Sequence, residues 1–274
     1  LCLVVHPGIV GDRGPSALDW AIQGGFKEWG VTVLQAEAEM DAGPVWAAAT
    51  FPLRAARKAS IYRHEVTEAA VRAVTAAVNR QFEPNFKPER VPGEAHATMR
   101  QSDRGIDWQH DDSATVLAKL NAADGFPGVA DVLFGEPCHL FDAWPEAIFK
   151  GAPGSLLGHR ETAICRATAD GAVWIGHVKA AGGIKLPTTL AFPAAAELPE
   201  LALAGYWKSP TPTWQDIAYE EAAGVGFLSF EFYNGAMSTS QCRRLTEASA
   251  WAATRPTKVI VLRGGSDFWS NGIH

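Results

Sequence analysis

Two residues near the start of the chain, His6 and Asp41, have the types and the surroundings of an acid–base pair. His6 follows a short apolar stretch and precedes Pro-Gly, and Asp41 follows Met40 and precedes Ala-Gly-Pro. An unperturbed His titrates near pH ~6.5, and a neighbouring carboxylate can orient its ring. The alternative is a His at a strand end and an Asp in a turn. We predict that both residues are catalytic and lie within one bridging water, on adjacent strand ends.

The elements that must position this pair follow an α/β pattern. An apolar run ends at His6, and a helix is expected after Pro15 with Ser16 as its cap. Hydrophobic periodicity predicts further strands at 30–37 and 45–51 and a long amphipathic helix at 60–81. We assign residues 1–83 to this first domain and the Pro-rich residues 84–95 to a linker.

The rest of the chain divides into two further segments. Residues 96–205 contain a helix at 113–121 and short apolar runs separated by turns, which predicts a small β-barrel from strands at 129–134, 138–143, 162–168 and 172–179. Residues 213–274 read as strand 225–232, a helix ending near Ala253, and strand 257–262. Because one such unit buries little apolar surface, we expect these strands to keep an uncovered face and the isolated chain to aggregate.

Composition limits the function classes. The 274 residues are 47% hydrophobic and 20% charged, which is ordinary for a globular protein. A net charge of −6 argues against nucleic-acid binding. The four cysteines are widely separated, and neither they nor the histidines have metal-ligand spacing, so we predict reduced thiols and no metal site. No apolar run or leader-like segment indicates a membrane protein or secretion, so we expect a soluble, cytoplasmic protein.

Both ends of the sequence lie inside expected elements. Residue 1 falls within the first strand, and residue 274 ends a Gly-rich loop in mid-course. We expect the chain to be an internal fragment of a longer protein.

The first 45 residues resemble the core of 10-formyltetrahydrofolate-dependent formyltransferases. The likeness lies in the His-Pro segment at His6, the Asp-Arg-Gly loop at 12–14, the Gly-Val-Thr strand at 30–32 and the segment around Asp41. It implies a Rossmann-like catalytic domain of which residues 1–83 are the C-terminal part, 10-formyltetrahydrofolate as formyl donor, and catalytic roles for His6 and Asp41. The family has an Asn two residues before the His, and Val4 stands here, so the usual donor to the tetrahedral oxyanion is missing.

The loop around Arg13 and Gly14 is the predicted cofactor-binding segment of the first domain. Arg13 precedes a helix, where backbone N–H groups and a guanidinium could meet an anionic group of the folate or of coenzyme A. An Arg in a solvated turn is an equally weighted alternative.

The middle segment resembles the C-terminal domain of methionyl-tRNA formyltransferase. The likeness rests on Gly-Ile-Asp-Trp at 105–108, the helix after it, and Phe-Pro-Gly at 126–128. It implies an OB-like fold that helps to hold tRNA in that enzyme. The basic residues of 96–205 are spread out here, which favours a structural spacer over a tRNA site.

The last segment resembles the start of the crotonase (enoyl-CoA hydratase) fold. Asn-Gly-Ala-Met-Ser at 234–238 opens its helix, and a Gly-rich loop follows the second strand. An ordinary strand–helix–strand unit is the alternative. The resemblance implies coenzyme A binding, with backbone N–H groups donated to the thioester oxygen from Ser270, Asn271 and Gly272.

The order of the three segments resembles the HypX (HoxX) hydrogenase maturation proteins. That family implies formyl transfer from 10-formyltetrahydrofolate to coenzyme A, then decarbonylation of formyl-CoA to carbon monoxide, a ligand of the iron in nickel–iron hydrogenases. It implies small-molecule substrates and hydrogenase maturation proteins as partners, and a fragment inactive alone. The alternatives are a methionyl-tRNA or sugar-nucleotide formyltransferase with an unrelated tail, and a non-catalytic scaffold in which Val4 marks a dead site.

Overall fold

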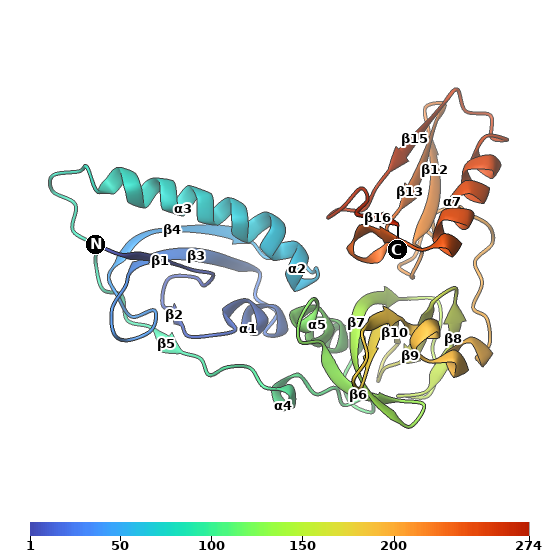
Figure 1. Cartoon of the computed structure of the whole chain (residues 1–274), viewed down its shortest axis with the longest axis horizontal. Coiled ribbons are helices and arrows are strands. Elements are labelled where there is room, and N and C mark those ends of the chain that lie inside the picture. Colours follow the sequence, from blue (N-terminus) through green and yellow to red (C-terminus); the bar gives the residue numbers. More distant parts are fainter. Residues whose placement is uncertain (274) are drawn as a thin grey trace. The chain divides into compact units, whose positions relative to one another are not determined.

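The first sheet contains three strands whose order brings the end of β1 to the middle of β3. The strands are β1 (Leu3–His6), β3 (Glu28–Gln35) and β4 (Val45–Pro52), in the order β1-β3-β4 (Figure 1). Both pairings are antiparallel, and β3 connects to β4 through a loop without a helix. The computed structural model describes residues 1–273, and residue 274, the last of the predicted Gly-rich loop, lies outside the described residues.

Helices cover one face of this sheet. Residues 29–34 of β3 are all buried, so both faces of this central strand are covered, and Trp29, Val31 and Val33 lie on the face toward the helices. The predicted helix at 60–81 is confirmed as a continuous run of α2 (Lys58–Ile61), a π-helical segment η1 (Tyr62–Val66) and α3 (Thr67–Arg80). Its small buried residues recur every four positions, at 69, 73 and 77, and let α3 lie close along β3 and β4 (Figure 1).

The short helix α1 (Ala17–Gln23) begins where the sequence predicts, but its cap differs from the prediction. Ser16 is the N-cap residue, yet it adopts a left-handed conformation with φ of 64° and its hydroxyl accepts no bond from the first turn of α1. Its Oγ instead accepts the N–H of Met99 at 3.3 Å. Ser16 therefore fastens a distant segment to α1 and does not act as a side-chain cap.

The predicted linker at 84–95 takes part in the fold. Its end forms β5 (Glu94–Ala95), which pairs in parallel with β2 (Asp12–Arg13), with Asp12 opposite Glu94 and Arg13 opposite Ala95. Backbone bonds from Glu94 N to Gly11 O and from His96 N to Arg13 O, of 2.9 and 2.8 Å, fix the pair. This pairing fastens the Asp-Arg-Gly loop to a segment more than eighty positions away.

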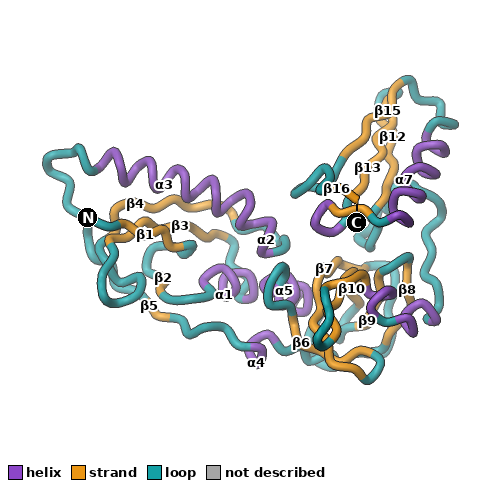
Figure 2. The backbone as a smooth tube through the Cα atoms, viewed as in Figure 1, coloured by secondary structure: helices purple, strands orange, loops and turns teal. Residues whose placement is uncertain are grey.

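The middle segment forms an open sheet, which corrects the predicted barrel. Two helices precede it, α4 (Gln101–Arg104) and α5 (Ser113–Ala123). Its strands, orange in Figure 2, are ordered β6-β7-β10-β9-β8, with β11 beside β10. Within residues 1–273 no pairing joins β6 to β8. Closure requires two edge strands to pair, which periodicity does not reveal. The strands are β6 (Val129–Leu133), β7 (Glu136–Glu146), β8 (Leu156–Arg160), β9 (Ala163–Ala167), β10 (Ala172–Ala180) and β11 (Lys185–Pro187).

The last segment contains the predicted strand–helix–strand unit. Strands β13 (Val225–Phe230) and β15 (Val259–Arg263) are parallel and joined through α7 (Thr239–Ala252), which Ser238 and Gln241 cap reciprocally. A strand that the sequence reading missed, β12 (Ile217–Ala222), pairs antiparallel with β13. The short elements of the remaining chain are α6 (Thr188–Ala191), η2 (Pro193–Glu197), η3 (Tyr233–Gly235), β14 (Ala236–Met237) and β16 (Gly272–Ile273).

The expected uncovered strand face is found at β15 alone. All five residues of β15 are exposed, including its four apolar ones, whereas alternate residues of β13 are buried against α7 and β12. The prediction was therefore wrong for β13.

By contacts, the chain forms two compact units. The first comprises 1–107, 114–141 and 180–182, and the second comprises the other described residues. The predicted boundaries at 83, 95, 205 and 213 remain predictions. Within the described residues, no helix is both long and apolar enough to cross a bilayer.

Candidate functional site

His6 lies on the face of the first sheet opposite to α3. It is paired with Thr32 in β3, so their side chains point to the same face, whereas the neighbouring Val31 and Val33 point to the helices. Thr32 is 2% exposed, and its hydroxyl donates to the carbonyl of Gly8 at 2.8 Å. This bond holds the turn that follows β1. The side chain of His6 lies beside this turn, and the residue is only 5% exposed.

Two carboxylates flank the imidazole ring of His6. Its Nε2 lies 2.7 Å from Oδ2 of Asp12, a hydrogen bond between two buried side chains. Its Nδ1 lies 3.3 Å from Oδ2 of Asp41, whose side chain is 15% exposed. The predicted proximity of His6 and Asp41 is therefore confirmed, and their catalytic role stays a prediction.

Asp41 reaches His6 from a loop and not from a strand end. It lies four positions before β4, and β1 and β4 are separated by β3, so the predicted adjacent strand ends are wrong. Its backbone is left-handed, with φ of 54°, an arrangement that costs energy for a residue with a Cβ and often marks a functional position. Oδ2 of Asp41 also accepts the N–H of Gly14 at 3.0 Å, which fixes the carboxylate.

The sequence reading missed Asp12 and His96. His96, which was assigned no special role, places Nε2 3.2 Å from Oδ1 of Asp12 and has a side chain that is 38% exposed. The only signal for Asp12 was its place in the Asp-Arg-Gly loop. No local signal could have found His96, because the β2–β5 pairing brings it to Asp12.

The predicted cofactor-binding residues of the first domain have partners within the fold. Arg13 donates to the carbonyl of Val91 at 3.0 Å and lies 3.4 Å from the exposed Glu39. Gly14 uses its N–H on Asp41, and a Cβ at this glycine, which has φ of +94°, would lie 2.5 Å from the carbonyl oxygen of His96. The binding role of Arg13 and Gly14 stays a prediction.

The predicted thioester-binding loop belongs to the second compact unit. The N–H of Asn271 donates to Gly235 O at 2.7 Å, and that of Gly272 donates to the Ser270 hydroxyl at 3.1 Å. Both N–H groups therefore already have acceptors in this arrangement, and the role assigned to Ser270, Asn271 and Gly272 stays a prediction.

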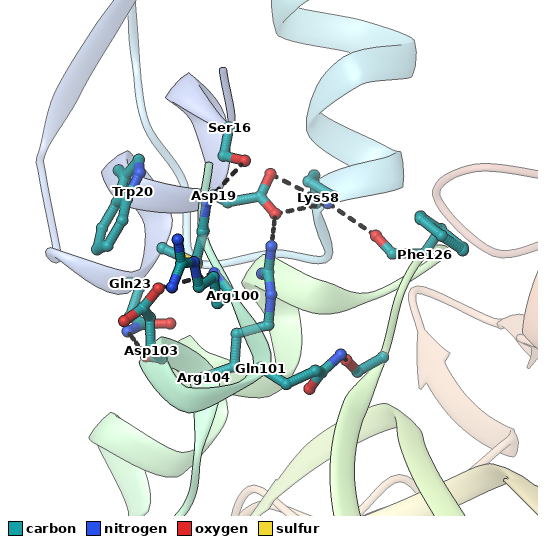
Figure 3. A network of polar contacts seen from close by, with 12 residues as sticks. Ser16, Asp19, Trp20, Gln23, Lys58, Arg100, Gln101, Asp103, Arg104 and Phe126 are labelled. Carbon is teal, nitrogen blue, oxygen red and sulfur yellow. Dashed lines mark hydrogen bonds and ion pairs between the residues drawn. The ribbon is translucent and has the colours of Figure 1, made fainter. Parts of the chain in front are cut away.

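A second buried charge cluster is centred on Asp19, in the first turn of α1. Asp19 accepts from Arg104 at 2.6 Å and from Lys58 at 2.9 and 3.0 Å, and Lys58 also donates to the carbonyl of Phe126 at 2.9 Å (Figure 3). Burial lowers the pKa of Lys58 from its ordinary 10.5, an effect that its pairing with Asp19 opposes. The cluster ties α1, α2 and α4 together.

The two clusters differ in what they can do chemically. An imidazole between two carboxylates can take up a proton and stabilise the resulting cation, which suits acyl transfer. A carboxylate between an Arg and a Lys has two donors that hold it in place, and it has no imidazole beside it to accept a proton from a substrate. The geometry therefore favours His6, with Asp12 and Asp41, as the reactive group.

The formyl transferase C-terminal domain model matches residues 98–192. The chain is 50% identical to the hydrogenase maturation factor HoxX of Bradyrhizobium diazoefficiens, over 100% of this chain and 48% of HoxX. A crystal structure of HypX from Aquifex aeolicus in complex with tetrahydrofolic acid is 46% identical with a TM-score of 0.93, over 99% of this chain and 49% of HypX. The methionyl-tRNA formyltransferase of Dechloromonas aromatica is 28% identical, over 68% of this chain and 60% of that enzyme. The chain thus spans about half the length of HoxX and HypX.

Proposed function

We infer that the chain is part of a HoxX/HypX-type hydrogenase maturation factor with a formyltransferase C-terminal domain, and we propose that it carries out formyl transfer from 10-formyltetrahydrofolate to coenzyme A. The observation that carries this proposal is the buried His6 between two carboxylates, at the position that the formyltransferase motif gives to the catalytic His. The tetrahydrofolate complex of HypX, similar over 99% of this chain, supports a folate as donor.

The chemistry assigned to His6 is proton transfer. The coenzyme A sulfur attacks the formyl carbon, a C–S bond forms, and the C–N10 bond of the folate breaks. His6 accepts the thiol proton on Nδ1 and returns it to N10, so atoms and charge balance. Asp41, 3.3 Å from Nδ1, stabilises the imidazolium that exists between these two steps.

The second half of the proposal concerns the fate of formyl-CoA. We assign its decarbonylation, which yields carbon monoxide and free coenzyme A, to a crotonase-like region that begins with the β13-α7-β15 unit. The parallel strand–helix–strand arrangement of this unit is consistent with the start of such a fold. Carbon monoxide would then serve as a ligand of the hydrogenase iron.

The extent of similarity argues against a tRNA formyltransferase with an unrelated tail. The match to HoxX covers the whole chain, including the β13-α7-β15 unit, whereas the match to methionyl-tRNA formyltransferase covers 68% of it. The scaffold alternative would leave a buried His with two carboxylates and no reaction to perform.

The experiment that tests the proposal supplies the full-length protein with 10-formyltetrahydrofolate carrying a carbon-13 formyl group. Coenzyme A and initiator methionyl-tRNA are offered as acceptors in separate reactions. We expect labelled formyl-CoA by mass spectrometry and labelled carbon monoxide in the gas phase with coenzyme A only. Label on the tRNA, or no transfer to either acceptor, would overturn the assignment.

A further inference from the structure

We propose that Asp12 is the positioning residue of His6, holding the ring so that Nδ1 faces the reacting groups and Asp41. This proposal rests on the formyl-transfer function proposed above. It reverses the division of roles expected from the sequence, in which Asp41 was the carboxylate that orients the His.

The two contacts of His6 differ in kind. The bond from Nε2 to Asp12 is 2.7 Å long and joins side chains that are 4% and 2% exposed. The approach of Nδ1 to Asp41 is 3.3 Å, and Oδ2 of Asp41 already accepts the N–H of Gly14 at 3.0 Å. The shorter bond, between two buried side chains, fixes the ring, whereas the longer contact with Asp41 holds Nδ1 less tightly.

The donor and acceptor capacities of the two side chains determine which ring nitrogen of His6 can accept a proton. A carboxylate only accepts, so the bond to Asp12 requires the proton of a neutral His6 to be on Nε2. The lone pair is then on Nδ1, which faces Asp41. When Nδ1 takes a proton, it becomes a donor toward Asp41, and the cation has a carboxylate on each side. This is the arrangement of a base with a separate orienting group.

The backbone around the pair is built for this contact. A Cβ at Gly8 would lie 2.2 Å from Nε2 of His6 and 2.4 Å from Oδ2 of Asp12, so only glycine lets them meet. The bond from Thr32 to the carbonyl of Gly8 holds this turn in place. Asp12 is held by its N–H bond to Ile9 O, of 2.9 Å, and by the β2–β5 pairing.

The other oxygen of Asp12 reaches His96. Oδ1 is buried and accepts no hydrogen bond from the described residues, and Nε2 of His96 lies 3.2 Å away. Asp12 is thus placed between one buried and one partly exposed imidazole.

The first test reads the tautomer of His6 and does not depend on activity. Nitrogen-15 NMR of histidine-labelled full-length protein, with the His6 signals assigned through His6→Gln, reports which ring nitrogen is protonated in the neutral form. We expect protonated Nε2 in the wild type and a loss of that preference in Asp12→Asn. A neutral His6 protonated on Nδ1, or signals unchanged in Asp12→Asn, would overturn the proposal.

The second test is a double-mutant cycle on the rate of formyl transfer. Removing the orienting Asp of a catalytic triad costs up to about 10⁴-fold in kcat. We expect Asp12→Asn to lower kcat by at least about 100-fold with KM values for both substrates within about threefold. It should cause no further loss in the His6→Gln background. Glu94→Gln, at the exposed position opposite Asp12 on β5, is the matched control and should retain wild-type kinetics.

Gly8→Ala provides an independent variant that leaves Asp12 intact. The added Cβ displaces His6 from Asp12, so we expect the same loss of kcat and the same change of tautomer. A further loss when Asp12→Asn is added to His6→Gln, or wild-type kcat in Asp12→Asn, would contradict the positioning role. If wild-type protein forms no formyl-CoA, the proposed function fails, while the NMR result still decides the role of Asp12.

Discussion

Asp12 and Asp19 are two buried carboxylates seven positions apart, on either side of the start of α1. Their hydrogen-bond partners differ, and so do the roles that we infer for them. Asp12 is bonded to His6, a group that can change its charge during a reaction. Asp19 is bonded to Arg104 and Lys58, the first of which is permanently charged in proteins (Figure 3). The two carboxylates are similarly buried, so burial alone does not distinguish them; the type of partner, a His or an Arg with a Lys, does.

The Asp19 cluster also illustrates why buried ion pairs are poor evidence of function. It joins three helices within one compact unit, and one nitrogen of Arg104, Nη1, is buried and has no hydrogen-bond partner among residues 1–273. A cluster of two cations on one carboxylate costs desolvation energy and fixes geometry. Its predicted phenotype is a loss of stability without a loss of chemistry.

The largest effect on stability is expected from Asp19→Asn. This change leaves the buried cations of Arg104 and Lys58 without their carboxylate, which we expect to lower the free energy of unfolding by about 3–5 kcal/mol. Thermal unfolding of the full-length protein measures the loss, with exposed Glu68→Gln as control. The formyl-transfer rate per folded molecule should stay within about twofold. A selective loss of rate at unchanged stability would place Asp19 in the reactive site and contradict the distinction drawn between Asp12 and Asp19.

A smaller effect, on activity, is expected from Asp41→Asn. The amide keeps the size of the side chain but removes the charge that stabilises imidazolium at His6. We expect kcat to fall by roughly 100-fold, within the range for one acid–base contribution, with little change in thermal stability. Steady-state kinetics of the purified variant give the answer. Equal falls in activity and stability would indicate that Asp41 mainly supports the loop.

The smallest effect concerns Lys58 and pH. Because burial lowers its pKa below 10.5, the unfolded chain binds a proton in a range where the folded chain has already released it. The contribution of Lys58 to the free energy of unfolding therefore rises as the pH increases toward 10.5. In Lys58→Met this rise should be absent. The unfolding midpoint of the wild type, measured relative to that of the variant, should therefore increase as the buffer becomes more alkaline. Parallel pH dependences of the two proteins would show that Lys58 titrates normally.

Local sequence predicts much of this fold, and long-range pairing explains the parts that it misses. The spacing of the apolar residues in β3 predicts a strand, and the four-residue spacing of Ala69, Ala73 and Ala77 predicts a helix. The two-residue strands β2 and β5 have no periodicity, and neither strand predicts the other. Barrel closure likewise depends on whether β6 meets β8, which no local pattern encodes.

The same reasoning applies to the site. His6 and Asp41 stand in motifs, so both could be named from the sequence. The contact of Asp12 with His6 depends on the turn at Gly8, and the approach of His96 depends on β5 lying beside β2. The missed strand β12 is a different case, because the buried Ile217 and Tyr219 alternate with the partly exposed Ala218 and Glu220. Period-2 counting would have found it.

The most direct test of the central claim, that His6 is the proton-transfer group for formyl transfer to coenzyme A, is a single-turnover measurement on full-length His6→Gln. Excess enzyme is mixed with labelled 10-formyltetrahydrofolate and coenzyme A, and formyl-CoA is quantified over time. The account predicts a transfer step slowed by about 10³-fold, with folate binding and thermal stability near those of the wild type. A transfer rate within a few fold of the wild type would contradict it.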